Sequence, residues 1–519
     1  MIKNDDIFSL FGIMNDDTLL IDEIETINNT KVIHISKKLI STFCPCCNSR
    51  MHSKGIYVRK IKHQVLQDST KLYLYVKQRT WICPVCKHRI QDSFPFLKRY
   101  SQSSNIIPYL VLDELADLNR TTASVAKQFN LSDTQVHNIF TSYVDMQRLP
   151  LPEIISVDEV YLNTSKKDLY AFVIMDFVSG EIIDILPNRL SRTLDKYFYS
   201  IPRDERKKVK YIISDAYKTY LNFTKNYFPN AISIVDGFHI TKSLIQMLND
   251  YIYKTIKKFR EKDKKRLAQL NHDTNSDHKQ IKESTEIYIL RSYKWILLKN
   301  QDDINYTHNL HYDRTLKMYL DTYQIEKMFL EIDKNFPMLR QLKEEYIAFS
   351  HTSFDNEDEV KDKLNNLIKM YEASDQYIFH NFAAILKEHS DAIINSFIII
   401  EVKRKTTKDH EKHLARLSNG PMESFNRKPK DYKRNSRGSS NFYYTRNRIL
   451  FATRSRKVVL AVPKPHEAVH SISEKKEVLI IKKQINKTKL NVTTQKKKSL
   501  KHLQKFLFYV VFIKQSLFD

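Results

Sequence analysis

Short apolar runs separated by turns fill residues 150–240, and they predict alternating strands and helices. The expected elements are strands at 154–162, 169–177 and 182–186, a helix near 191–200, a strand at 209–214, a helix near 216–228 and a strand at 231–235. Three meandering strands followed by helix, strand, helix and strand is the ribonuclease-H-like order. In that order the first and fourth strands are neighbours, so we expect Asp158 and Asp215 to come together.

Residues 238–400 combine abundant Lys and Glu with apolar positions that repeat about every 3.6 residues, and this period predicts helices. One such pattern runs from Tyr319 through Ile325 to Phe329. A connection of this length is too long for a loop. We therefore expect an all-helical insertion between the fifth strand and the last helix of the α/β core.

All five cysteines lie within the first 104 residues. Cys44 and Cys47 form one C-x-x-C pair, Cys83 and Cys86 form another, and strand-like alternation separates the two pairs. This spacing predicts a zinc ribbon, in which four thiolates hold a structural Zn²⁺ ion. Free thiols or a disulfide pair are the alternative, and the paired spacing argues against it. Additional candidate ligands close to these pairs are Cys46, His52 and His88.

Residues 105–148 predict helices, among them two that are joined by a short break at 130–132. Ser132 or Asp133 would be the N-cap of the second helix. The apolar contacts expected inside a helix-turn-helix are Val125, Ala126, Phe129, Leu131, Val136 and Ile139. The side chains that the second helix would present to a DNA groove are Thr134, Gln135, His137 and Asn138. An ordinary helical hairpin is the alternative.

The charge of the chain indicates an anionic partner. The 519 residues include 85 Lys and Arg against 60 Asp and Glu, a net charge of +25. Nucleic acid or an anionic membrane surface would fit. However, the best apolar run, 506–513, is far shorter than the roughly 18–20 residues of a membrane-spanning helix. The N-terminus also has no signal-peptide pattern. We therefore expect a soluble cytoplasmic protein that binds DNA and no membrane.

Carboxylates at strand positions suggest a metal site. Asp158 lies inside an apolar run, where a buried charge needs compensation such as a metal ion, and Glu159 points to the opposite face. Asp215 ends a strand, where it could instead cap the next helix; capping and metal binding are compatible. Asp236 ends the fifth strand in the same way, and with His239 it makes a reserve site.

Glu423 is the third acid of interest, and it has a competing structural explanation. If Gly420 is the N-cap and Pro421 the first helical residue, Glu423 occupies the capping-box position. The basic run that follows favours catalysis, because phosphate-binding side chains would bring DNA to the acid. The basic residues of this run are Lys428, Lys430, Lys433, Arg434, Arg437, Arg446 and Arg448, and the first five are our candidates for DNA binding.

These motifs and their order resemble bacterial insertion-sequence transposases of the DDE type, in particular the ISL-three family. The similarity runs from Cys44 to Arg454 and is carried by CPCC, WICPVC, the helix-turn-helix, SVDE, ISDAY, VDGFHI and residues 418–438. By this resemblance the DDE triad is Asp158, Asp215 and Glu423, and the ribbon ligands are Cys44, Cys47, Cys83 and Cys86. Lys430 matches the family's basic residue after the glutamate, and Asp236 and His239 match a signature without an assigned role.

The resemblance implies that the triad holds two Mg²⁺ (or Mn²⁺) ions and cuts and joins double-stranded DNA. The ribbon and helix-turn-helix would bind the terminal inverted repeats, and pairing of element ends and target would need at least a homodimer on DNA. We expect this multidomain α+β chain in the bacterial cytoplasm, associated with the nucleoid. The expected parts are a zinc ribbon (1–104), a helix-turn-helix (105–150), a ribonuclease-H-like core (151–240), a helical insertion (241–401), the last core helix with a basic segment (402–456) and a basic tail of low order (457–519).

Two other functions are compatible with parts of the sequence. A DNA-binding regulator that has lost catalysis would need only the ribbon and the helix-turn-helix. A structure-selective nuclease would use the acids to cleave branched DNA without specific ends.

Overall fold

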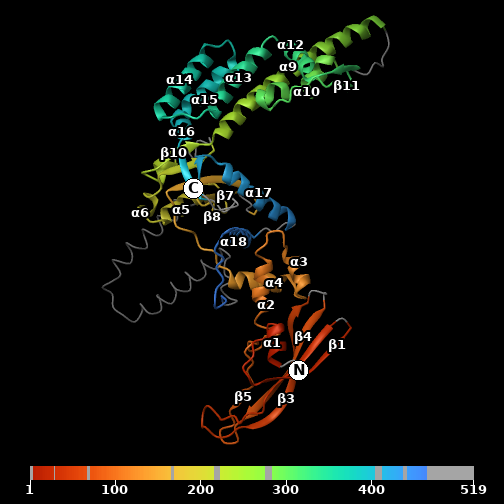
Figure 1. Cartoon of the computed structure of the whole chain (residues 1–519), viewed down its shortest axis with the longest axis vertical. Coiled ribbons are helices and arrows are strands. Elements are labelled where there is room, and N and C mark those ends of the chain that lie inside the picture. The colour runs from red at the N-terminus through yellow and green to blue at the C-terminus, as the bar shows by residue number, and fades with distance from the viewer. Residues whose placement is uncertain are drawn as a thin grey trace, which may run out of the picture. The chain divides into compact units, whose positions relative to one another are not determined.

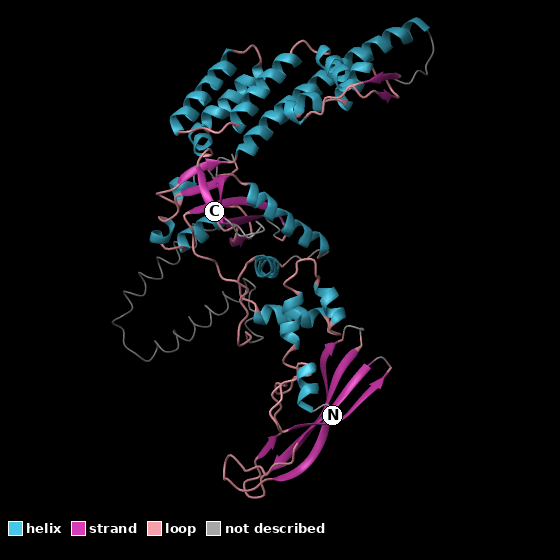
Figure 2. Cartoon of the chain, viewed as in Figure 1, coloured by secondary structure: helices cyan, strands magenta, loops and turns pink. Residues whose placement is uncertain are grey.

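The computed structural model describes residues 4–28, 30–66, 70–164, 169–215, 223–274, 283–403, 412–436 and 441–464. The chain forms two compact units. The N-terminal unit contains residues 1–145 and 458–519, and the second unit contains residues 146–457. Each unit has its own sheet, and most of the helices belong to the second unit (Figures 1 and 2).

The sheet of the N-terminal unit has five strands in the order β1-β2-β4-β3, with β5 also paired to β4. Their bounds are β1 (Leu19–Ile27), β2 (Thr30–Lys37), β3 (His52–Val65), β4 (Lys71–Ile82) and β5 (Arg89–Gln91), and helix α1 (Asn4–Leu10) precedes them. The pairs β3–β4 and β4–β5 are antiparallel, whereas β2–β4 is parallel. Alternate residues of β4, namely Leu72, Leu74 and Val76, are buried, so one face of the sheet carries the core of this unit.

Three helices follow this sheet: α2 (Ile107–Glu114), α3 (Thr122–Gln128) and α4 (Asp133–Tyr143). Ser132 is the N-cap of α4 and forms a capping box with Gln135. Asn130, two residues after the end of α3, has a φ of 53°, and the N–H of Leu131 donates to the Ala126 carbonyl at 2.9 Å. The sequence prediction of two helices around a break at 130–132 is confirmed.

The turn between α3 and α4 is bonded to the sheet. The side-chain amide of Asn130 donates to the Tyr73 hydroxyl at 2.9 Å, and the Lys62 ammonium donates to the Asn130 carbonyl at 2.7 Å. The end of α4 is also paired with a segment much later in the sequence, because the Leu460 N–H donates to the Tyr143 carbonyl at 2.8 Å. Of the tail expected from residue 457 onward, residues 465–519 lie outside the described part of the chain.

The second unit is built on a five-stranded sheet in the order β10-β9-β6-β7-β8. The strands are β6 (Ile154–Tyr161), β7 (Tyr170–Asp176), β8 (Ile182–Leu186), β9 (Tyr211–Ser214) and β10 (Ile232–Val235). Strands β6, β7 and β8 form an antiparallel meander, while β9 and β10 run parallel to β6. The first and fourth strands of the unit are therefore neighbours, as the sequence predicts.

The two faces of this sheet are covered differently. On one face, Ile155 and Val157 pack with Leu194 and Phe198 of α5 (Ser191–Ser200). Two short helices follow, α6 (Arg203–Arg206) and α8 (Phe223–Asn226); residues 216–222 of the predicted helix near 216–228 lie outside the described residues. On the other face, Ile154, Ile213 and Ile234 pack with Val402 and Leu417.

Val402 belongs to a strand that the sequence analysis did not anticipate. Strands β13 (Ile399–Lys403) and β14 (Lys412–Arg416) form an antiparallel pair, where we expected only the end of the helical insertion and the start of a basic segment. The pair is explained by burial, because Val402 is 1% exposed and packs on the apolar face of the sheet.

Helices dominate residues 237–395, as predicted. They are α9 (Gly237–Thr274), α10 (Thr285–Ser292), α11 (Trp295–Leu298), η1 (Gln301–Asp303), α12 (Thr322–Glu331), α13 (Phe336–His351), α14 (Glu357–Ala373), α15 (Tyr377–Glu388) and α16 (Ser390–Asn395). They share one apolar core that includes Val235 of β10 and Ile240 of α9. The insertion and the sheet therefore pack as one body within this unit.

The helical prediction is wrong for residues 311–320. Strands β11 (His311–Asp313) and β12 (Met318–Leu320) form a hairpin, so Tyr319 lies in a strand and not in a helix. Helix α12 begins only after Asp321, whose side chain accepts from the Gln324 N–H and whose own N–H bonds to the Gln324 side chain. This capping box marks the start of α12, whereas the apolar repeat from Tyr319 to Phe329 had predicted one continuous helix.

The last two helices are α17 (Gly420–Asn435) and α18 (Phe442–Thr453). Arg446 of α18 forms an ion pair with the buried Asp184 of β8 at 2.5 Å, and Arg448 is 1% exposed. Both arginines belong to the basic run of the sequence, but the ion pair of Arg446 and the burial of Arg448 give them structural roles. Among the described residues, none of the helices combines the length and apolarity required to cross a bilayer.

Replacing the cap of α4 should destabilise the N-terminal unit. We expect Ser132→Ala to lower its free energy of unfolding by about 0.5–2 kcal/mol, because the backbone donor of Gln135 loses its acceptor. The two tryptophans, Trp81 and Trp295, lie one in each unit. Urea unfolding followed by Trp81 fluorescence in a Trp295→Phe background measures the effect. Ser132→Asp keeps a capping oxygen and should stay close to the parent; an equal loss in both variants would contradict the capping role.

Candidate active site and metal centre

Parallel pairing aligns three aspartates at one edge of the sheet in the second unit. Ser156 of β6 pairs with Ile213 of β9, so the same register places Asp158 beside Asp215 two residues later. Val235 of β10 pairs with Ser214, which places Asp236 on the other side of Asp215. This edge lies at the carboxyl ends of parallel strands, where open sheets commonly bind ligands.

The three aspartates also share one face of the sheet. Ile154, Ile213 and Ile234 belong to the same apolar cluster, and each aspartate follows one of them by two or four residues. Since side chains alternate along a strand, all three carboxylates point to the face that β13 and β14 cover. Glu159 instead forms an ion pair with Arg189 at 2.9 Å, in agreement with the choice of Asp158 over its neighbour.

His239 contacts carboxylates of this site. We call Asp158, Asp215, Asp236 and Glu423 the acidic cluster. It lies in the first turn of α9, and its Nε2 atom is 2.7 Å from Asp215 Oδ1 and 3.9 Å from Glu423 Oε1. The potential ligand atoms of Asp236, His239 and Glu423 all lie within 4.8 Å of one another. The sequence analysis kept Asp236 and His239 as a reserve site, but the structure places both among these acids.

Helix α17 brings Glu423 and Asn426 to the strands. The Asn426 side-chain amide donates to Asp158 Oδ2 at 2.7 Å, and the Glu159 N–H donates to Asp158 Oδ1 at 2.7 Å. The two carboxylate oxygens of Asp158 therefore accept hydrogen bonds from two different elements, α17 and β6. The sequence analysis missed Asn426, although it follows Glu423 by three residues and therefore shares its side of the helix.

Glu423 does not occupy the capping-box position that we considered for it. The N-cap of α17 is Asn419 and not Gly420, so Glu423 is the fourth helical residue. Its backbone N–H donates to the Asn419 carbonyl at 3.0 Å, as in an ordinary helical turn. Its carboxylate is directed toward His239, at the distance given above.

Burial and mutual repulsion raise the pKa values of Asp158, Asp236 and Glu423. Burial, followed by the charge of Asp215, raises the pKa of Asp158 to about 7. Burial also raises the pKa of Asp236, although its carboxylate accepts from the Phe238 N–H at 3.3 Å. Burial and the charge of Asp236 raise the pKa of Glu423. A cation at this position would offset the cost of burying these carboxylates and the repulsion among them. Carboxylate oxygens are ligands that Mg²⁺ and Mn²⁺ accept.

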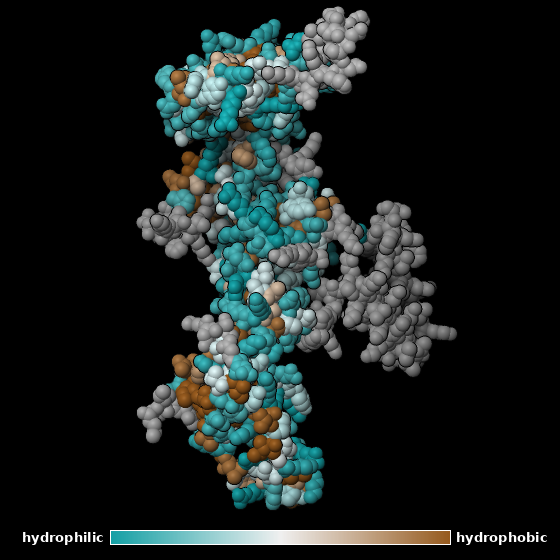
Figure 3. Space-filling model, turned by 90° about the vertical axis from the view of Figure 1, so that its right-hand side faces the viewer, coloured by the Kyte–Doolittle hydropathy of each residue, from teal (hydrophilic) through white to brown (hydrophobic). Residues whose placement is uncertain are grey.

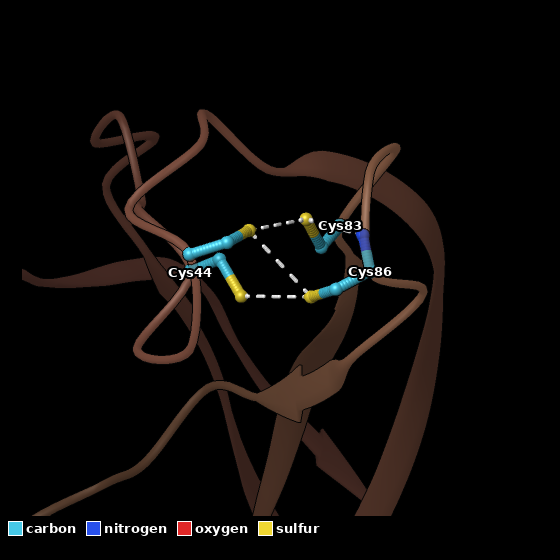
Figure 4. A group of neighbouring side chains, drawn as sticks. Cys44, Cys83 and Cys86 are labelled. Atoms are coloured by element: carbon cyan, nitrogen blue, oxygen red, sulfur yellow. Dashed lines mark hydrogen bonds between the residues drawn. The ribbon is translucent and has the colours of Figure 1, made fainter.

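A second candidate metal centre lies in the N-terminal unit, where four cysteine sulfurs converge (Figure 4). Cys44 and Cys86, and likewise Cys47 and Cys83, are 3.4 Å apart between their Sγ atoms, and Cys47 and Cys86 are 3.6 Å apart. A disulfide would need about 2.05 Å. A zinc ion with bonds of about 2.3 Å spaces its sulfurs by about 3.8 Å, close to these values. The set fits zinc and not a disulfide pair.

The two cysteine pairs have the same backbone conformation. The N–H of Asn48 donates to the Cys44 carbonyl, and the N–H of Lys87 donates to the Cys83 carbonyl. Asn48 and Lys87 have positive φ angles of 56° and 60°. Hydrogen bonds from Ser49 lower the pKa of Cys47 to about 6, which favours the thiolate that a metal needs. Cys46 is exposed and stands outside this four-cysteine set.

The residues expected to contact DNA lie on two helices. On α4, Thr134 and Gln135 are exposed and His137 and Asn138 are half-buried, although the Gln135 side chain also closes the capping box. On α17, Lys428, Lys430 and Arg434 are exposed and Lys433 is half-buried. Arg437 lies outside the described residues.

Removing one ligand of the cysteine set should unfold the region around it. We expect Cys83→Ser to lose bound zinc, because three thiolates hold the ion less well and the apolar cluster here is small. Zinc content of the purified chain and its susceptibility to proteolysis between residues 44 and 90 measure the loss. Cys46→Ser is the matched control and should keep one zinc per chain; zinc loss in that variant would contradict the assignment of ligands.

The raised pKa of Asp158 predicts a pH effect on stability in the absence of divalent metal. Because this pKa is higher in the folded than in the unfolded chain, the folded state binds more protons between about pH 4 and 7. Its stability therefore falls as pH rises through that window. We expect Asp158→Asn to be more stable than the parent by a few kcal/mol at about pH 8, and by less at about pH 5.

Thermal unfolding in a chelating buffer measures this difference. Asp204→Asn is the control, because that side chain is 91% exposed and should show little dependence on pH. A stability difference between Asp158→Asn and the parent that is the same at both pH values would contradict the burial of this carboxyl.

Comparisons with known proteins agree with these two units. Residues 155–449, more than half of the chain, match the ISL3 family of DDE transposases, whose description is transposase. Residues 93–144 match the helix-turn-helix domain of transposase family ISL3. Helices α2, α3 and α4 therefore belong to a helix-turn-helix domain and are not an ordinary helical hairpin. None of the curated proteins matches this chain. The catalytic-domain match covers every carboxylate of the acidic cluster, and the chain belongs to the ISL3 family of transposases.

Proposed function

We propose that this transposase cuts and rejoins DNA at the acidic cluster, with Asp158, Asp215 and Glu423 as its DDE triad. The observation that carries the proposal is the contact of His239 with two of these acids, at 2.7 Å from Asp215 and 3.9 Å from Glu423. The strand register places the third acid, Asp158, beside Asp215. The residues come from β6, the end of β9 and α17, so folding alone brings them together.

The triad would hold two Mg²⁺ or Mn²⁺ ions, which supply activation of the attacking hydroxyl and stabilisation of charge on the leaving oxygen. The protein's own contribution is positioning. Asn426 and the Glu159 N–H hold the two oxygens of Asp158, and His239 holds Asp215. Asp236 is held by the N–H groups of Phe238 and Asn419, which ties the start of α9 to the start of α17.

Helix α17 would deliver DNA to these acids. Glu423 lies in its first turns, and exposed Lys428, Lys430 and Arg434 follow on the same helix. Phosphates bound by these cations would pass close to the carboxylates, and such contacts make binding depend strongly on salt concentration.

The N-terminal unit would choose where the enzyme cuts. We propose that α4, with Thr134, Gln135, His137 and Asn138, enters a DNA groove at the terminal inverted repeats, and that the zinc-bound ribbon supports it. Two ends must be held together for transposition, so at least two copies of the chain would act on one DNA complex.

Neutralising any member of the triad should abolish cleavage and leave DNA binding intact. We expect Asp158→Asn, Asp215→Asn and Glu423→Gln each to reduce Mg²⁺-dependent cleavage at least about a thousandfold, because each removes a metal ligand. Cleavage of a supercoiled plasmid that carries the ends of this chain's own insertion sequence measures activity, and a gel-shift assay with the same ends measures binding.

Glu159→Gln is the matched control for Asp158→Asn, because it changes the next carboxylate on the same strand. It should keep cleavage within about tenfold of the parent, since its side chain pairs with Arg189. Cleavage that survives in Asp158→Asn, or that is lost equally in Glu159→Gln, would refute the assignment. Retained binding with cleavage already absent from the parent would instead favour the regulator described above.

A further inference from the structure

The N-terminal unit contains a groove that the helix-turn-helix does not use. It has a volume of about 950 Å³ and lies on strands β3, β4 and β5, with residues 93–100 along one side. This is near the upper limit of about 1,000 Å³ for small-molecule pockets, so an extended ligand fits it better than a single small ion. Figure 3 shows that hydrophobic surface also gathers on the N-terminal unit.

The floor of the groove is held in place by one buried amide. Gln78 is 7% exposed, and its Oε1 atom accepts from the Tyr57 hydroxyl at 2.6 Å and from Arg59 Nη1 at 3.2 Å. Its Nε2 atom donates to the Asp92 carbonyl at 2.7 Å, and Arg59 Nη2 donates to the Ser101 carbonyl. A tyrosine ring and a guanidinium are therefore fixed at the surface before any ligand binds.

A second tyrosine stands at the rim in an unusual conformation. Tyr100 has a φ of 61° in a turn closed by the Ser101 N–H and the Lys98 carbonyl, a position that glycine or asparagine normally takes. Its side chain is 79% exposed, and the Arg99 guanidinium lies 4.9 Å from its ring centre. The fold does not need this ring for packing, and an exposed bulky residue at positive φ suggests a binding role.

The lining of the groove is strongly positive. Its basic residues are Lys54, Arg59, Arg89, Lys98 and Arg99, together with His88. Its one carboxylate, Asp92, is already engaged, because the Trp81 indole N–H donates to it at 2.7 Å and the Arg79 N–H at 3.3 Å. Cations interleaved with exposed aromatic rings are the combination with which proteins bind a nucleic-acid strand.

We propose that this groove binds one strand of DNA, with its cations on the phosphates and Tyr57 and Tyr100 against sugars or bases. The inference deepens the proposed function, on which it rests, because it gives the ribbon a contact with DNA separate from that of α4. The groove and the helix-turn-helix are fixed to each other through Lys62 and Tyr73, which bond to the α3–α4 turn. The strand comes either from a duplex or from a single-stranded segment, which have the same backbone chemistry.

The test uses the full-length chain and two probes of mixed sequence, a 30-base-pair duplex and a 30-nucleotide single strand, in fluorescence anisotropy titrations at several salt concentrations. The variant Lys54→Gln/Arg89→Gln/Arg99→Gln removes three exposed cations of the groove. We expect the affinity of this variant for DNA to fall about tenfold or more. The slope of log K against log salt should also shrink by about 2–3, because each lost phosphate contact contributes about 0.9 on a duplex and about 0.7 on a single strand.

The matched control removes the same charge from a helix of the other unit. Lys361, Lys363 and Lys369 are exposed on α14, and their triple change to Gln should leave the salt slope closer to that of the parent. Zinc content shows that the N-terminal unit of the groove variant is folded, and circular dichroism of the whole chain shows that both variants are folded. A loss confined to one probe identifies the source of the strand; equal behaviour of the groove variant and the control on both probes overturns the proposal.

Tyr100→Asn separates stacking from charge, because Asn tolerates positive φ and leaves every cation in place. We expect about tenfold weaker binding with an unchanged salt slope; unchanged affinity would remove the tyrosine from the proposal. The cleavage assay on Asp158→Asn is independent of these titrations. If Asp158→Asn still cleaves DNA and the groove variant binds weakly, only the active-site assignment is refuted. If Asp158→Asn does not cleave DNA and the groove variant binds like the parent, only the groove proposal is refuted.

Discussion

The parallel pairing of β6, β9 and β10 is the constraint on which the second unit depends. Because side chains alternate along a strand, a register slip of one residue would turn Asp158, Asp215 or Asp236 to the opposite face. The apolar residues Ile154, Ile213 and Ile234 prevent such a slip, since they must stay under β13 and β14. The geometry of the acids is therefore fixed by hydrophobic residues that have no chemistry of their own, and the repulsion among the carboxylates is opposed by the burial of those residues.

The helical insertion contributes to the same geometry. Helix α9 begins directly after Asp236 and carries His239, so its first turn is part of the acidic cluster. The chain returns through β13 and β14 to the covered face of the sheet, and α17 then places Asn426 against Asp158, 268 residues away in sequence. Since Val235 and Ile240 belong to the core of the helical region, the insertion supports the cluster at the start of α9.

The sequence predicts those features that depend on local patterns. The strand order, the two cysteine pairs and the capped second helix of the helix-turn-helix follow from alternation, spacing and cap residues. Features that depend on tertiary packing were missed or misjudged. Arg446 and Arg448 belong to the basic run of the sequence, but Arg446 pairs with the buried Asp184 and Arg448 packs on the ring of Tyr432. The β13–β14 pair was missed because its sequence is rich in charge, and only contact with the sheet explains it.

Asn130 shows how one residue can couple α4 to the sheet that carries the groove in the N-terminal unit. Its positive φ ends α3 and sets the angle at which α4 leaves the turn. Its side-chain amide and its carbonyl are bonded to Tyr73 of β4 and Lys62 of β3, which are adjacent strands of the sheet in the N-terminal unit. The conformation that ends the helix and the contacts that attach it to the sheet therefore belong to the same residue. Consequently α4 cannot rotate relative to the sheet without breaking both bonds, and DNA that contacts α4 and the groove on β3, β4 and β5 must match one fixed spacing. A spacing set by the protein in this way makes recognition depend on the length and path of the bound DNA as well as on its bases.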